Sequence, residues 1–166
     1  MLVLLVFVAA ALVGLPLATS HPGSPPSDQR AAETVAPTVG DGRWSDVLAR
    51  IDARRDRAWR QGRPGRLATV FVPGSAALRA DRAALRGYLR RGYEVGPTRL
   101  AYWQVRVVAD PRDRVRLAMV DRLLPVQVTG PDGRRHALPA DRPTRHVVTL
   151  VHSARSDWRI ATIRDR

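Results

Sequence analysis

The chain has 166 residues, which is enough for one domain of ordinary size with appendages at its ends. It contains no cysteine, and this excludes disulfides, thiolate metal sites and cysteine nucleophiles. The formal net charge is +13, and all 28 basic residues are arginine. Phosphate-binding surfaces usually combine lysine with arginine, so arginine alone indicates a coding bias more than a specific anionic partner.

Residues 2–18 form an apolar run without a charged or strongly polar side chain. The run is at the short end for a membrane-spanning helix, and Gly14 and Pro16 interrupt it. Small residues follow at 18–20, as at a signal-peptide cleavage site. We therefore predict that residues 1–20 are a signal peptide or an uncleaved membrane anchor, and that the rest is extracytoplasmic, at the cell membrane or secreted. Because no Lys or Arg precedes the run, the reverse orientation stays open.

Residues 21–42 are rich in Pro, Ser, Thr, Gly and Ala and show no apolar periodicity. Such a segment cannot bury enough apolar surface to become ordered, so we predict a disordered linker. Residues 1–42 contain a single arginine, Arg30, against three acidic residues. The positive charge is therefore concentrated in residues 43–166, which we predict to be one folded domain.

The domain opens with a predicted amphipathic helix that ends near Gly62, with Asp41 or Ser45 available as its N-cap. Its apolar positions recur every three or four residues, except around Arg54 and Arg55: Trp44, Val47, Leu48, Ile51, Ala58 and Trp59. These apolar residues, the tryptophans included, are expected to be core anchors.

Two further helical pieces are expected before the first strand. One covers about 66–72 and ends at the proline and glycine of 73–74. The other covers 82–91, capped by Asp81 and closed by Gly92.

After Pro97 the period of the apolar residues changes from about 3.6 to 2, which predicts strands. The predicted strands are 100–109, 115–124, 145–152 and 158–163, with 126–129 as a continuation of the second beyond Pro125. Turns are expected at 110–113 and 131–133. Helices followed by an antiparallel meander are typical of the α+β class, with the N-terminal helices packed on the sheet.

This order of elements, Trp44 with Val47 and Leu48 in the first helix, and a closing strand around Trp158 resemble the nuclear transport factor 2-like superfamily. The resemblance covers 43–166 and implies a cone-like fold, in which helices packed on a curved antiparallel sheet enclose an apolar pocket. Ketosteroid isomerases and polyketide cyclases belong to this superfamily, but other members are binding or assembly modules, so the fold alone does not choose a function. More narrowly, the chain resembles small exported actinobacterial proteins. No catalytic motif of the enzymatic members matches, so no catalytic residue and no cofactor is assigned.

Three residues are candidates for lining the pocket. Asp121 shares strand parity with Leu117 and Met119, which would turn its carboxylate toward the apolar face, where it could act as a base or contact a ligand. A simpler interpretation places Asp121 at the end of the sheet, paired with an arginine. Tyr102 and Trp103 are adjacent, so they face opposite sides of a strand, and one of them could line a pocket or an interface.

Other chemistry has less support in the sequence. His146 and His152 share strand parity but lie about 20 Å apart along an extended chain, so they cannot bind one metal ion. We predict no metal site and expect solvated or edge histidines. Ser75 lacks the strand–elbow–helix setting of a nucleophile and is expected to cap a helical turn. The sequence has neither a Walker loop nor a dinucleotide-binding glycine motif.

Three functions follow as hypotheses. The first is a non-enzymatic extracytoplasmic domain that binds or assembles with an envelope protein. The second is a small-molecule enzyme or carrier with Asp121 and Tyr102 at the mouth of its pocket. The third is a basic peripheral domain that binds anionic lipid or wall polymer through paired arginines: Arg54-Arg55, Arg90-Arg91 and Arg134-Arg135. Nucleic acid is not expected, because no aromatic-plus-basic motif accompanies the charge.

Overall fold

The computed structural model describes residues 42–166 apart from 112 and 154–155. The apolar run at 2–18, the linker up to residue 41 and Asp41 as an N-cap lie outside the described residues, so they stay predictions. Within the described part of the chain, no helix combines the length and the apolar character needed to cross a membrane.

The elements follow the α+β order that the sequence predicts, with helices first and strands after them. The helical elements are α1 (Gly42–Arg60), the 3-10 helix η2 (Pro64–Thr69) and α2 (Ala76–Arg90). The strands are β1 (Glu94–Val95), β2 (Leu100–Ala109), β3 (Arg114–Leu123), β4 (Val126–Thr129), β5 (Arg135–Leu138), β6 (Thr144–Ser153) and β7 (Ser156–Asp165).

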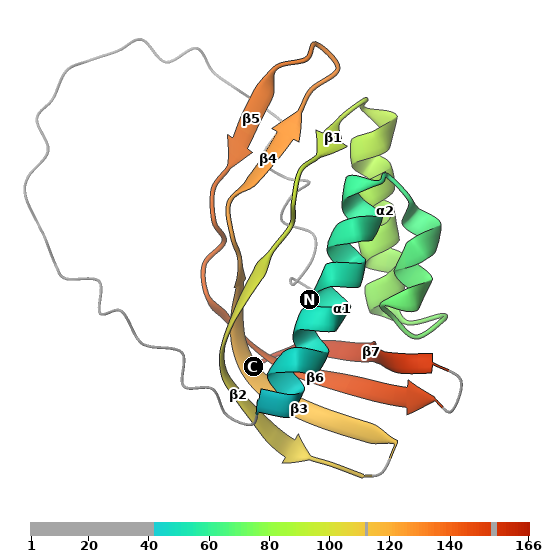
Figure 1. The fold of residues 1–166 in the computed structure, drawn as a ribbon, viewed down its shortest axis with the longest axis vertical. Coiled ribbons are helices and arrows are strands. Elements are labelled where there is room, and N and C mark those ends of the chain that lie inside the picture. The colour runs from blue at the N-terminus through green and yellow to red at the C-terminus, as the bar shows by residue number, and fades with distance from the viewer. Residues whose placement is uncertain (1–41, 112, 154–155) are drawn as a thin grey trace, which may run out of the picture.

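The strands form two antiparallel sheets. Four long strands pair in the order β2-β3-β6-β7, and three short ones pair in the order β1-β4-β5. The chain passes from β3 into β4 through Leu124 and Pro125, so the two sheets continue one another. Figure 1 shows the strands curving around α1, with α2 on the same side of the sheet as α1.

The helices and one face of the four-stranded sheet enclose the core. We call this face the inner face and the opposite one the outer face. Along β3, Val115, Leu117 and Met119 are buried on the inner face, while Arg114 and Arg116, which alternate with them, are exposed. The largest fully buried side chains include Trp44, Trp59, Tyr88 and Phe71. The two tryptophans of α1 are core anchors as predicted, and Trp158 packs against the core with its side chain partly buried.

The start of α2 differs from the prediction. The helix begins at Ala76, and the Ser75 hydroxyl accepts a hydrogen bond from the Leu78 amide at 3.2 Å, so Ser75 is the N-cap. This confirms the capping role predicted for Ser75 and shows that Asp81 as a cap was wrong. Asp81 lies inside the helix on the face that carries Leu78 and Leu85, and it is fully buried.

Two short strands and one strand connection also differ from the prediction. Residues 126–129 do not continue β3 in the same sheet but form β4, which pairs with β1 and β5. Pro125 cannot donate to a ladder, so strand pairing is interrupted there. The turn predicted at 131–133 is present, with Gly133 at φ +77, and it leads into β5, which the sequence did not reveal.

Buried Asp81 holds α1 against α2. Arg55 of α1 donates to it twice, from Nε to Oδ2 at 3.0 Å and from Nη2 to Oδ1 at 2.9 Å. Trp59 donates from Nε1 to Oδ1 at 3.1 Å. This bidentate pair satisfies a carboxylate that burial would otherwise make costly. Because Arg55 is committed to this contact inside the protein, it is not part of a surface patch, contrary to the expectation for the Arg54-Arg55 pair.

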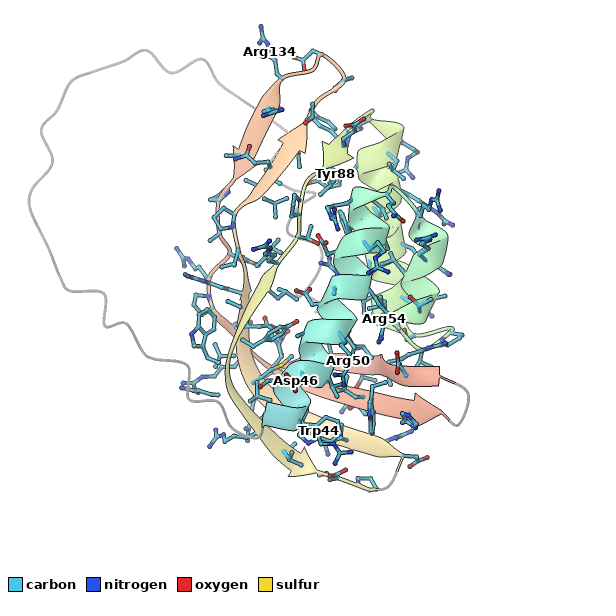
Figure 2. All side chains as sticks on the ribbon, viewed as in Figure 1. Trp44, Asp46, Arg50, Arg54, Tyr88 and Arg134 are labelled. Carbon is cyan, nitrogen blue, oxygen red and sulfur yellow. The ribbon has the colours of Figure 1, made fainter. Side chains whose placement is uncertain are left out.

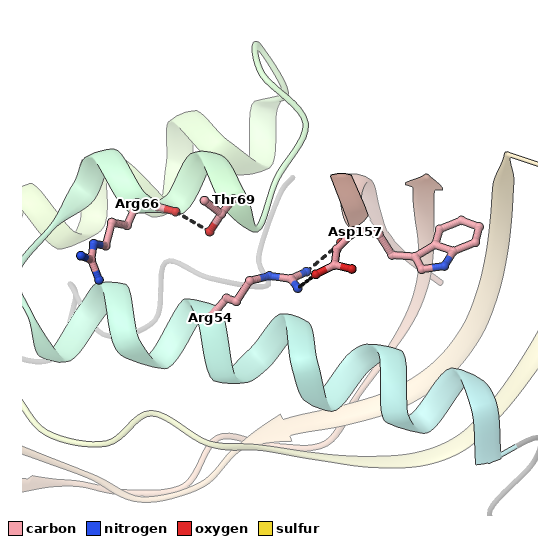
Figure 3. Close-up of polar contacts among 5 residues, drawn as sticks. Arg54, Arg66, Thr69 and Asp157 are labelled. Atoms are coloured by element: carbon pink, nitrogen blue, oxygen red, sulfur yellow. Dashed lines mark hydrogen bonds and ion pairs between the residues drawn. The ribbon is translucent and has the colours of Figure 1, made fainter. Parts of the chain in front are cut away.

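A second arginine of α1 reaches the last strand. Arg54 donates from Nη1 to Asp157 Oδ2 at 3.0 Å and from Nη2 to the carbonyl oxygen of Trp158 at 2.8 Å (Figure 3). Burial lowers the pKa of the Arg54 guanidinium from its usual value, while the Asp157 carboxylate acts in the opposite direction. Arg134, by contrast, lies at the tip of the β4–β5 hairpin, away from Arg54 (Figure 2). The predicted arginine pairs therefore do not gather into one patch.

Candidate functional site

The inner face of the sheet carries a group of polar side chains within the apolar core. Tyr102 of β2 and Asp121 of β3 are direct cross-strand partners, so their side chains share the inner face. Asp121 is buried, with 3% of its surface exposed. Strand parity therefore predicted the inward orientation of Asp121. Asp121 also lies near the end of the sheet, opposite Thr144 at the start of β6, but its ion-pair partner within the described residues is His146 and not the expected arginine.

His146 lies beside Asp121 and is also buried. The imidazole Nε2 is 3.4 Å from Asp121 Oδ1, and Nδ1 is 3.2 Å from Asp165 Oδ1. The His146 side chain is fully buried, whereas that of Asp165 is 39% exposed. The expectation that His146 would be solvated or at an edge was wrong, because this residue shares the strand parity of buried Val148 and Leu150.

The third carboxylate of the group comes from α1. Asp52 Oδ2 accepts a hydrogen bond from the Leu100 amide at 3.2 Å, while Asp52 Oδ1 is buried without a hydrogen-bond partner among the described residues. Burial raises the pKa of the Asp52 carboxyl to about 6, against the opposing effect of the Leu100 hydrogen bond and of Arg55. The carboxylates of Asp56 and Asp121 add to the rise.

The Tyr102 hydroxyl is affected by the same environment. Burial raises its pKa well above the usual value, and the negative charges of Asp52 and Asp121 add to the rise. Tyr102 therefore remains a neutral phenol at physiological pH and can donate a hydrogen bond from its hydroxyl.

The cavity between α1 and the inner face is nearly filled. Its volume is about 30 Å³. It is lined by the polar residues Asp52, Arg55, Tyr102 and Asp121 together with apolar side chains that include Leu48, Ile51, Met119, Val148, Ile160 and Ile163. A space of this size admits about one or two water molecules, whereas pockets for organic ligands measure roughly 300–1,000 Å³. This cavity therefore has no room for an organic substrate.

The three predicted pocket residues do not lie on the same face of the sheet. Tyr102 and Asp121 line the cavity, but Trp103 pairs with Val120 on the outer face, where the Arg122 guanidinium lies 5.3 Å from its ring centre. Asp52 was not predicted as a site residue, and His146 was predicted at a solvated or edge position instead. Asp52 falls on the helix face of Leu48 and Arg55, so helical periodicity could have revealed it, as strand parity could have revealed His146.

His146 lies between two carboxylates, but neither of its ring nitrogens makes a hydrogen bond within the described residues. Asp121 Oδ2 is likewise buried without a hydrogen-bond partner there. Among the residues that the structure describes, no three His, Asp or Glu side chains converge as metal ligands would.

The outer face has the opposite character. Its arginines include Arg106, Arg114, Arg116, Arg122, Arg145 and Arg164. Each of them pairs across the strands with alanine, valine or threonine and none with a carboxylate. None of these six forms an ion pair within the described part of the chain.

This face contains a hollow with a volume of about 260 Å³. The residues around it are Gln104, Arg106, Ala118, Met119, Val120, Arg145, His146 and Arg166. Ala118 and Val120 alternate with the inward-facing Leu117, Met119 and Asp121, so the hollow opens on the side of the sheet away from α1.

No family model matches the chain, and no curated protein matches its sequence. Among solved structures, the intermembrane space region of the chloroplast protein ARC6 is similar, with a TM-score of 0.51 and 10% identity over 78% of this chain and 98% of that one. The protein Aln2 from a Streptomyces species gives a TM-score of 0.48 and 18% identity over 76% and 93% of the two chains. A candidate scytalone dehydratase from Novosphingobium aromaticivorans gives 0.45 and 14% over 75% and 85%. The likeness to the ARC6 region shows a shared fold and nothing about activity.

Proposed function

We propose that the domain is a non-catalytic binding or assembly module, held at the outer side of the cytoplasmic membrane by its N-terminal segment. The observation that carries this proposal is the cavity of about 30 Å³, which leaves no space for an organic substrate beside Tyr102 and Asp121. An open hollow lies instead on the outer face of the sheet. A domain of this kind would act through its surface.

Two observations support the place of action. Residues 2–18 are long enough and apolar enough for the membrane, and a linker without apolar periodicity separates them from the domain. The fold is also that of the ARC6 region, which belongs to an intermembrane space. We also propose that the domain belongs to the nuclear transport factor 2-like superfamily. The order of its elements, helices first and then the sheet, supports this.

A reporter fusion tests the location. Alkaline phosphatase fused after Arg166 of the full chain folds only outside the cytoplasm, so we expect phosphatase activity in intact cells. A matched chain with Leu5→Arg and Val6→Arg in the apolar run should lose that activity. Activity from a cytoplasmic fluorescent reporter at the same position, without phosphatase activity, would contradict the proposed location.

A pocket enzyme or carrier is the second candidate, and one observation favours it. The Asp52 carboxyl, with a pKa of about 6, shares the interior with Tyr102, Asp121 and His146, and a group with such a pKa can act as an acid or a base near neutral pH. This function requires the cavity to open for its ligand.

Thermal unfolding of the full chain separates the two candidates. With a panel of small cyclic ketones and phenols, a non-catalytic module should show no rise in its unfolding midpoint. If a compound raises the midpoint by several degrees, and a variant with Tyr102→Phe and Asp121→Asn that still folds loses the effect, the pocket function is supported and the first proposal fails.

A further inference from the structure

The hollow on the outer face brings together positive charges from separate parts of the chain. Arg106 comes from β2 and Arg145 from β6, while Arg166 follows β7. The Arg106 and Arg145 side chains are exposed, and no carboxylate side chain lines the hollow. Like charges held near one another repel, and a bound anion would relieve this repulsion.

The backbone at the edge of the hollow is irregular. The pairing of β2 with β3 shifts between Trp103 and Arg106, which marks a β-bulge, and Gln104 within it has φ +53. A left-handed conformation costs about 1–2 kcal/mol for a residue other than glycine, and bulges commonly redirect a side chain next to a functional site. Here the bulge places Gln104, whose amide can donate hydrogen bonds, beside the arginines of the hollow.

We propose that this hollow is a binding site for a phosphate-bearing anion, held by Arg106 and Arg145 with Gln104 and Arg166 beside them. The guanidinium group offers a planar fork of donors that fits phosphate oxygens in pairs, and several forks suit an anion with more than two acceptor oxygens. The volume of about 260 Å³ fits a phosphate group with a small substituent.

This proposal rests on the proposed function, which makes the outer face the binding surface. It adds the chemistry of the ligand. Two sources share this chemistry: the headgroup of an anionic phospholipid and a free phosphate. The positive face extends beyond the hollow through Arg116, Arg122 and Arg164. This favours a ligand that is itself part of a larger anionic surface, such as a lipid headgroup in a membrane.

Calorimetric titration of the full chain in an uncharged detergent tests the site. The probes are inorganic phosphate, glycerophosphoglycerol as the deacylated headgroup of an anionic lipid, and glycerophosphocholine as a zwitterionic comparison, all at one ionic strength. The test variant is Arg106→Gln with Arg145→Gln. The matched control is Arg57→Gln with Arg86→Gln, which removes the same charge from exposed positions on α1 and α2.

We expect the test variant to bind the preferred probe about 100-fold more weakly, since each charge-assisted hydrogen bond accounts for roughly a factor of ten, and the control to bind as the wild type does. Stronger binding of glycerophosphoglycerol identifies a lipid headgroup, and stronger binding of inorganic phosphate identifies a free anion; either supports the site. Equal weakening in both variants, or no binding of either anionic probe at millimolar concentration, would overturn it.

A single-stranded oligonucleotide serves as a further probe. If it binds at least ten times more tightly than both anionic probes and the test variant releases it, the face is a nucleic-acid surface and the proposal is wrong. Phosphate binding does not depend on the orientation of the chain in the membrane, so its failure would leave the result of the phosphatase fusion intact.

Discussion

The two faces of the four-stranded sheet carry opposite chemistry on neighbouring residues. On the inner face, Asp121 lines a nearly filled cavity together with Asp52 of α1, and the fully buried His146 lies beside Asp121. On the outer face, arginines such as Arg106 and Arg145 stand exposed around a hollow without a carboxylate side chain. The strand period of two is enough to sort the residues in this way, since each step along β3 or β6 changes the face.

This contrast separates stability from function. Buried polar groups affect folding strongly, because each one must be desolvated and satisfied within the core. Exposed arginines affect it weakly, and they are available for a partner. We therefore expect substitutions inside to change the free energy of unfolding and substitutions outside to change binding.

The largest effect is expected at the buried ion pair. Asp81→Ala leaves the Arg55 guanidinium buried without its counter-charge, and should lower the free energy of unfolding by about 3–5 kcal/mol in urea denaturation. The matched control is Asp157→Ala, which breaks the ion pair of Arg54 with an exposed carboxylate and should cost less than about 1 kcal/mol. Equal losses in the two variants would show that burial does not set the strength of these pairs.

The next effect concerns Asp52 and depends on pH. Because burial raises its pKa from 3.8 to about 6, the native state binds more protons than the unfolded state in this window, and the stability of the wild type falls as the pH rises through it. Asp52→Asn cannot ionise, and its amide oxygen can still accept from the Leu100 amide. Its free energy of unfolding should exceed that of the wild type by on the order of 2–3 kcal/mol at pH 8 and by little at pH 4.

Asp46→Asn provides the comparison for this pH series, because Asp46 is exposed on the same helix (Figure 2). Its difference from the wild type should stay small at both pH values. A pH-independent effect of Asp52→Asn would contradict the burial of a destabilising charge on the inner side.

A smaller gain is expected at Tyr88, which is fully buried while its hydroxyl has no hydrogen-bond partner among the described residues. Burial raises the pKa of this hydroxyl to about 12, so it is neutral at all ordinary pH values. Tyr88→Phe removes the unsatisfied group and keeps the ring contact with Trp59, so thermal unfolding should show a gain of about 1 kcal/mol. The control Tyr93→Phe, at a half-buried position, should change stability little. A loss of stability in Tyr88→Phe would contradict the prediction, because it would show that the Tyr88 hydroxyl does make a hydrogen bond.

The smallest effect is expected on the outer face. Arg106→Gln with Arg145→Gln removes two exposed charges that form no ion pair within the described residues, so the free energy of unfolding should change by no more than about 0.5 kcal/mol. Chemical denaturation at moderate salt checks this value. A loss of about 2 kcal/mol or more would mean that these arginines stabilise the fold, and the separation of roles between the faces would not hold.

The sequence was informative where a local pattern determines the structure. The alternation from Leu100 to Ala109 predicted the bounds of β2, and the parity of Asp121 predicted the face it occupies. Asp81 was misassigned because an aspartate before a helical stretch satisfies the N-cap pattern, whereas its real partner, Arg55, lies 26 residues earlier in the chain.

Other features depend on packing between distant elements and could not be predicted locally. The filling of the inner cavity depends on how Leu48 and Ile51 of α1 meet the sheet. The outer hollow depends on the register of β2, β3 and β6 and on the bulge at Gln104. The bulge could not be predicted, because no glycine or other turn residue marks it in the sequence. Periodicity assigned residues to faces, but it did not reveal the volume that each face leaves open.

Chemical-shift mapping of the full chain with inorganic phosphate tests the contrast between the faces most directly. We predict that the amide and side-chain signals that shift belong to Gln104, Arg106, Val120 and Arg145 around the outer hollow, and that those of Asp52 and Tyr102 inside stay in place. Shifts centred on Asp52, Tyr102 and Asp121, with the outer arginines unaffected, would contradict the account and assign the binding site to the interior.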